Sequence, residues 1–137
     1  MLMPKKVKYR KQQRGKRRGK SKGATTLAFG KYGIQALEPA WLSAQQIEAM
    51  RVTISRRTKK FGKLFLRVFP YKPITKKPAE TRMGKGKGNV DRWVSVVKRE
   101  RIIFELDEVT EEVARNICKA AAYKLPMKVK FIKREGV

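Results

Sequence analysis

Apolar side chains recur at helical spacing between residues 43 and 60. Ile47, Met50 and Ile54 fall on one face of a helix. Ser43 and Gln46 form a capping box at its start, because each side chain can accept the backbone N–H of the other residue. The pattern predicts an amphipathic helix that begins just after Ser43.

A second helix is predicted over residues 111–124. Thr110 is a suitable N-cap, and Pro126 cannot continue a helix. We expect a flat packing face made of small or aliphatic residues: Val113, Ile117, Ala120, Ala121 and Ala122.

Other segments read as strands. Residues 63–69 are apolar with few polar interruptions, which is typical of a central strand. Residues 93–97 and 102–106 look like two strands joined by the charged turn 98–101, and apolar and basic residues alternate over 127–131. These elements predict an α+β fold, a mixed sheet with two helices packed on one side.

Two further segments are less regular. Residues 25–37 are rich in β-formers around two glycines, which predicts a hairpin or bent strands. Phe29 is expected in the core, whereas Tyr32 could pack there or stack on a base. Three prolines are expected to keep residues 70–80 out of sheet and helix.

Charge changes this picture more than any other property. The 137 residues include 36 Lys and Arg against 11 Asp and Glu, a net charge of +25. Residues 1–90 hold 25 basic and 3 acidic side chains (+22), and residues 91–137 hold 11 and 8 (+3). Such an excess disfavours the compact state unless a polyanion offsets it, so it predicts a nucleic-acid partner and argues against homo-oligomers.

Three basic groups are the candidate contacts. Residues 1–23 form a basic N-terminal arm without acids, of the kind that folds on binding nucleic acid. The later half of the first helix carries more cations than its dipole requires. The candidate phosphate-binding residues are Lys5, Lys6, Lys8, Arg10, Lys11, Arg14, Lys16, Arg17, Arg18, Lys20, Arg51, Arg56, Arg57, Lys59 and Lys60.

Residues 24–137 are expected to form a single domain with an extended loop over residues 70–90. The third basic group lies in this loop. Glycines alternate with lysines there, so the backbone can approach a partner closely while cations project from it. We expect this Gly/Lys-rich loop to protrude and to stay mobile until a polyanion neutralises it. Its central residues are Arg82, Met83, Gly84, Lys85, Gly86, Lys87 and Gly88.

The sequence offers few side chains that could carry out catalysis. There is no histidine, and the one cysteine, Cys118, lies on the apolar stripe of the second helix. The glycine loop lacks the Ser or Thr of a P-loop, so neither a metal nor another cofactor is expected. No apolar run approaches the roughly 20 residues that span a bilayer, and no secretory signal precedes Lys5.

Several stretches in combination resemble a known family. They are Met1 to Lys6 with Tyr9 to Lys11, Ala36 to Trp41, Gln45 to Ala49, Arg67 to Pro70, Lys72 to Thr75, Lys77 to Asn89, and Lys124 to Pro126. Together they are similar to the bacterial and organellar form of the universal large-subunit ribosomal protein numbered sixteen. The resemblance covers essentially the whole chain.

This resemblance implies an α/β hammerhead-like domain seated on large-subunit rRNA near the peptidyl-transferase region. It also implies that the loop 82–88 reaches toward aminoacyl-site tRNA, with Arg82, Lys85 and Lys87 as contacts. The implied setting is a ribosome in a bacterial cytoplasm or an organelle, with neighbouring ribosomal proteins as further partners.

Two other functions remain open from the residues alone. Charge and arm also suit a free-standing nucleic-acid-packaging protein, which would bind duplex DNA with steep salt dependence. A phosphate-handling enzyme would have to use the Gly/Lys loop, but the first ninety residues hold few acids for magnesium. Irregular basic arms favour folded RNA over a regular duplex.

Overall fold

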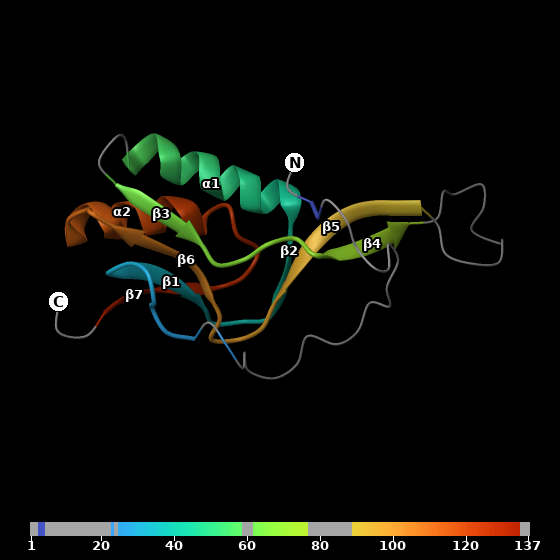
Figure 1. Ribbon diagram of the computed structural model, residues 1–137, viewed down its shortest axis with the longest axis horizontal. Coiled ribbons are helices and arrows are strands. Elements are labelled where there is room, and N and C mark those ends of the chain that lie inside the picture. Colours follow the sequence, from blue (N-terminus) through green and yellow to red (C-terminus); the bar gives the residue numbers. More distant parts are fainter. Residues whose placement is uncertain (1–2, 5–22, 24, 59–61, 77–88, 135–137) are drawn as a thin grey trace.

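The computed structural model describes residues 3–4, 23, 25–58, 62–76 and 89–134 (Figure 1). Its helices and strands follow in the order β1 (Tyr32–Ala36), β2 (Ala40–Ser43), α1 (Ala44–Thr58), β3 (Lys63–Leu66), β4 (Lys72–Lys76), β5 (Asn89–Val97), β6 (Ile102–Asp107), α2 (Glu111–Ala122) and β7 (Val129–Lys133).

The strands form two sheets. One has four strands in the order β3-β6-β1-β7 and the other has three in the order β2-β5-β4, and every described pairing is antiparallel. The predicted α+β class is confirmed, with two antiparallel sheets where we expected one mixed sheet.

Residues 98–101 lie at the crossing between the two sheets. The two predicted strands and the segment that joins them are present, but they do not pair with each other: β5 pairs with β2 and β4, whereas β6 pairs with β1 and β3. The backbone N–H of Ala36 donates to Arg101 O (2.9 Å), and that of Glu100 donates to Ala36 O (2.8 Å). Two antiparallel chain segments thus pass together from one sheet to the other, and Glu100 takes a positive φ of 76° there.

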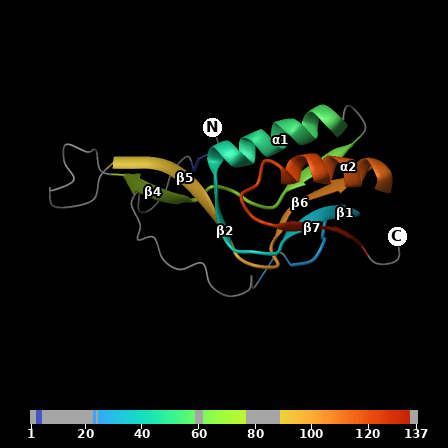
Figure 2. The ribbon, with the colours of Figure 1, turned by 180° about the vertical axis from the view of Figure 1, so that it is seen from behind.

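Both helices cover one side of the four-stranded sheet, as predicted (Figures 1 and 2). The capping box is present: Gln46 N donates to Ser43 Oγ (3.1 Å), and Ser43 N donates to Gln46 Oε1 (3.0 Å). The apolar face of α1 is fully buried, and Thr110 caps α2. The packing face of α2 is shifted, because Val113 is exposed and Ala114 and Cys118 are buried instead.

Residues 25–31 run over the opposite side of that sheet without forming a strand. Gly30 lies so close to β6 that a Cβ on it would stand 2.5 Å from Leu106 O, which accounts for the glycine. Phe29 is 57% exposed, so its predicted place in the core is wrong. Tyr32 is buried and stacks on Phe131, with ring centroids 5.8 Å apart.

Two strand predictions also need correction. The β3 strand is an edge strand rather than a central one; its apolar residues are covered because the helices lie on one side and Phe29 on the other. Residues 72–76 form β4, although we expected prolines to exclude 70–80 from a sheet. Pro73 is tolerated because β4 is also an edge strand, where a missing N–H need not break a ladder.

Candidate nucleic-acid interface

Most of the predicted contact residues lie outside the described residues. This holds for the arm candidates from Lys5 to Lys20, for Lys59 and Lys60, and for the loop from Arg82 to Gly88. Arg51, Arg56 and Arg57 are described, and all three lie on α1.

Arg56 and Arg57 line a groove between α1 and α2, which pack against each other. The groove has a volume of about 730 Å³. We call it the cationic groove, and its lining residues are Thr53, Arg56, Arg57, Asn116, Lys119, Ala120, Tyr123 and Lys124.

Four of those eight side chains are cationic, and no acidic residue is among the described residues that line the groove. Arg56 and Arg57 come from the last turn of α1, and Lys119 comes from the last turn of α2. Cations there also favour the helix dipoles, but a groove with four of them is a strong attractor for phosphate. Tyr123 adds an aromatic ring that is 79% exposed.

Arg51 differs from its neighbours. Its guanidinium forms an ion pair with Glu48 one turn earlier in α1. This hydrogen bond lowers the pKa of Glu48 and raises that of Arg51. Of the three described α1 candidates, Arg51 is therefore already compensated within the fold.

Sequence analysis missed the α2 half of the groove. Lys119, Tyr123 and Lys124 were not among the predicted contact residues, because cations near a helix C-terminus are ordinarily explained by the helix dipole. Only the packing of α1 on α2 places them beside Arg56. A usable signal was the spacing of Lys119 and Tyr123, which are four residues apart and fall on the side of α2 away from its buried residues.

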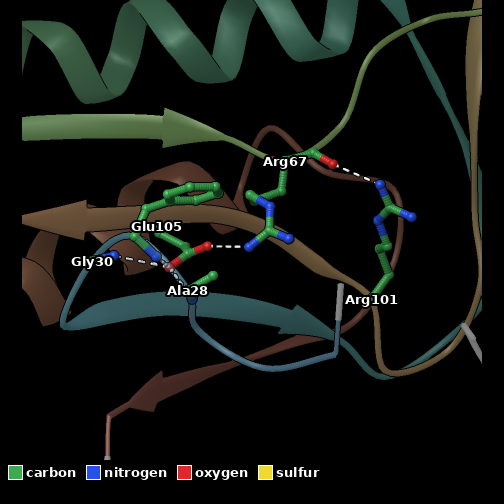
Figure 3. Close-up of polar contacts among 6 residues, drawn as sticks. Ala28, Gly30, Arg67, Arg101 and Glu105 are labelled. Atoms are coloured by element: carbon green, nitrogen blue, oxygen red, sulfur yellow. Dashed lines mark hydrogen bonds and ion pairs between the residues drawn. The ribbon is translucent and has the colours of Figure 1, made fainter. Parts of the chain in front are cut away.

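A second polar centre lies on the sheet side away from the helices, around Glu105 of β6 (Figure 3). This carboxylate is completely buried. Its Oε1 accepts the backbone N–H groups of Ala28 (2.8 Å), Phe29 (2.8 Å) and Gly30 (2.9 Å). Its Oε2 is ion-paired with the guanidinium of Arg67.

These contacts keep Glu105 ionised. Burial alone would raise its pKa, but hydrogen bonds from Gly30, Phe29, Arg67 and Ala28 lower the pKa below its ordinary value. Arg67 in turn accepts a hydrogen bond at its carbonyl oxygen from Arg101 Nη2 (2.8 Å). The sequence hint was a single glutamate within the apolar strand 102–106, and we had not interpreted it.

The ends of the Gly/Lys loop are held by the three-stranded sheet. Lys76 of β4 and Asn89 of β5 are register partners, so the chain leaves and re-enters the sheet at adjacent positions. This end of the β4–β5 pair points away from the two helices (Figure 1). The paired end formed by Lys76 and Asn89 therefore lies at the opposite end of the molecule from the cationic groove.

Other kinds of site find no support in the part of the chain that the structure describes. It holds no cluster of three or more His, Cys, Asp or Glu side chains that could bind a metal. Cys118 is buried, and desolvation raises the pKa of its thiol to about 12, which suits a core residue. No described helix is long and apolar enough to cross a membrane.

Comparison with known proteins agrees with this picture. Residues 4–132 match the family described as "Ribosomal protein L16p/L10e". The chain is 59% identical to the "Large ribosomal subunit protein uL16" of Pseudothermotoga lettingae, over all of this chain and 96% of that protein. It is 56% identical to the proteins of the same name from Thermosipho melanesiensis and Heliobacterium modesticaldum, over all of this chain and 96% and 95% of theirs. The chain belongs to the ribosomal protein L16p/L10e family.

Proposed function

We propose that the protein is a structural, non-enzymatic constituent of the large ribosomal subunit. Family membership over nearly the whole chain supports this role, as do the names of its relatives. Those relatives come from bacteria, which favours a ribosome in the bacterial cytoplasm.

Within the subunit, the cationic groove binds rRNA phosphates. The observation that carries this proposal is the convergence of four cations on one groove whose described lining includes no acid. Arg56 and Arg57 come from α1, Lys119 comes from α2, and Lys124 comes from the turn after α2. Each phosphate neutralised there releases counterions, so the contact strengthens as salt falls. The basic arm would add contacts of the same kind, since eleven cations fall between residues 4 and 23.

The Gly/Lys loop contacts aminoacyl-site tRNA and the rRNA near it. Its composition supports this role, because Arg82, Lys85 and Lys87 stand among glycines that permit close approach. The pairing of Lys76 with Asn89 supports it too. Because the two ends of the loop are held side by side in the sheet, the region that the loop can reach is limited. The loop and the groove would thus serve two RNA partners.

Membership of the large ribosomal subunit is tested by sedimentation of a cell lysate through a sucrose gradient, with the protein followed by mass spectrometry. We expect one copy for each large subunit. Recovery at the top of the gradient or with DNA would contradict the proposal and favour a packaging protein.

The test of the loop is the variant Arg82→Ala/Lys85→Ala/Lys87→Ala in purified ribosomes. We expect normal incorporation into the subunit and weaker binding of aminoacyl-site tRNA. A matched control removes three exposed cations elsewhere, Arg99→Ala/Lys128→Ala/Lys130→Ala, and should leave tRNA affinity unchanged. Equal tRNA affinity in both variants would contradict the role of the loop.

A further inference from the structure

Phe29 is a large apolar side chain that stays 57% exposed on the sheet side away from the helices. Its ring stacks on Phe65, with centroids 5.7 Å apart and planes inclined by 27°. The guanidinium carbon of Arg67 lies 5.0 Å from the same ring centroid. The ring is therefore supported by an aromatic and a cationic side chain at once.

Both supports lie beneath the ring: Phe65 belongs to β3, and Arg67 follows its last residue. Phe65 is the register partner of Glu105, and Arg67 is ion-paired with Glu105, so all three side chains lie on one face. Phe65 and Arg67 are also two residues apart in an extended chain, which places them side by side. The ring of Phe29 lies across Phe65 and Arg67. The surface of the ring that faces away from these two side chains is the exposed part.

The position of the ring is fixed by the backbone. Three successive N–H groups, from Ala28 to Gly30, bind one oxygen of the buried Glu105 carboxylate (Figure 3). Hydrogen bonds to a charged group are stronger than those between neutral groups. Because Phe29 is the middle residue of this set, it is preorganised, and a ligand would not have to order it.

We propose that Phe29 is a stacking platform for one unpaired base of RNA. A rigid aromatic ring with an open face accepts any base by stacking, and single-stranded RNA is bound in this way beside cationic grooves. This inference rests on the proposed function, because it names a further contact with rRNA.

Charge around the ring favours RNA over a protein partner. Lys31 and Arg134 are exposed and lie close together, since Arg134 N donates to Lys31 O (2.8 Å). The basic arm ends six residues before Phe29, and six residues span at most about 20 Å. An RNA strand bound by the arm would therefore lie within reach of the ring.

The experiment titrates the full-length protein with a transcript of the large-subunit rRNA of Pseudothermotoga lettingae at several salt concentrations. Phe29→Leu keeps an apolar side chain but removes the π face, whereas Phe29→Trp keeps and enlarges it. We expect Phe29→Leu to weaken binding roughly 5- to 150-fold with the same salt slope, because stacking releases no counterions. Phe29→Trp should bind at least as tightly as the unchanged protein.

Three results would overturn the proposal. They are unchanged affinity in Phe29→Leu, equal losses in both variants, and a loss that comes with a shallower salt slope. Unchanged rRNA affinity with poorer incorporation into the subunit would also overturn it and would assign the ring to a neighbouring protein. The groove variant Arg56→Ala/Arg57→Ala/Lys119→Ala/Lys124→Ala serves as reference in the same titration: if it weakens binding and Phe29→Leu does not, only this inference fails.

Discussion

The two sides of the four-stranded sheet treat positive charge in opposite ways. On the side away from the helices, Arg67 is ion-paired with the buried Glu105, so its charge is compensated inside the fold. On the helical side, Arg56 and Arg57 share the cationic groove with two lysines, and the described lining holds no acid. The charge of Arg67 is therefore balanced within the fold, whereas the charges of Arg56 and Arg57 would be balanced only by a bound partner.

This difference separates stability from binding. A compensated buried pair holds the segment around Phe29 in place, and losing one member leaves a buried charge or unsatisfied N–H groups. A cluster of like charges on the surface gains only the small contribution of the helix dipoles, and the charges repel one another until phosphate is bound. We therefore expect substitutions on the two sides to change different measurements.

The largest expected effect on stability belongs to Glu105→Ala. It removes the acceptor of three backbone N–H groups and the partner of Arg67. Breaking a buried ion pair costs about 3 to 5 kcal/mol. Urea unfolding of the isolated protein measures this free energy. A loss as small as that of Glu48→Ala, whose side chain is only half-buried, would show that the Glu105 contacts are not structural.

Arg67→Ala should cost less, because Glu105 keeps its three N–H donors. Hydrogen bonds to charged groups contribute about 1.5 to 3 kcal/mol, and we expect a loss of the free energy of unfolding in that range. Arg56→Ala is the matched control on the helical side and should leave that free energy unchanged. Equal losses in the two variants would remove the distinction between the two sides.

Acid should destabilise the protein through Glu105, on the side of the sheet away from the helices. The pKa of Glu105 is lowered in the folded protein from its ordinary value of 4.5, so its stabilising contribution is present above that value and is lost as pH falls through the folded one. The free energy of unfolding should fall below about pH 4.5. Glu105→Gln starts less stable and should lose less over the same interval.

The core beneath α2 should also protect the thiol of Cys118 from reagents. Because burial raises the pKa of the Cys118 thiol to about 12, its thiolate population near pH 8 is roughly 1,000-fold below that of a free cysteine. Alkylation by iodoacetamide should be correspondingly slow in the folded protein and fast in urea. Fast alkylation of the native protein would mean that α2 does not seal the core.

Local signals in the sequence predicted the helices well. The capping box of Ser43 and Gln46 and the N-cap Thr110 act through neighbouring residues, so they could be read without the fold, and the structure confirms them. The position of a strand in its sheet is different. Residues 63–66 look central because they are apolar, yet they form an edge covered by Phe29, which lies far away in the sequence.

The candidate site was predictable only in part, for the same reason. Arg56 and Arg57 stand out because the last turn of α1 carries more cations than its dipole requires. Lys119 and Lys124 join them only through helix packing, and the compensation of Arg51 by Glu48 depends on side-chain placement. Glu105 could not be assigned, because its three donors lie about 75 residues earlier.

The most direct test of the cationic groove is the salt dependence of rRNA binding. The groove variant Arg56→Ala/Arg57→Ala/Lys119→Ala/Lys124→Ala is compared with Arg92→Ala/Arg99→Ala/Lys128→Ala/Lys130→Ala, which loses the same charge elsewhere on the exposed surface. If all four groove cations bind phosphate, the plot of log affinity against log salt should become shallower by about 3 to 4 for the groove variant, with little change for the control. Equal slopes in the two variants would contradict a phosphate-binding groove between α1 and α2.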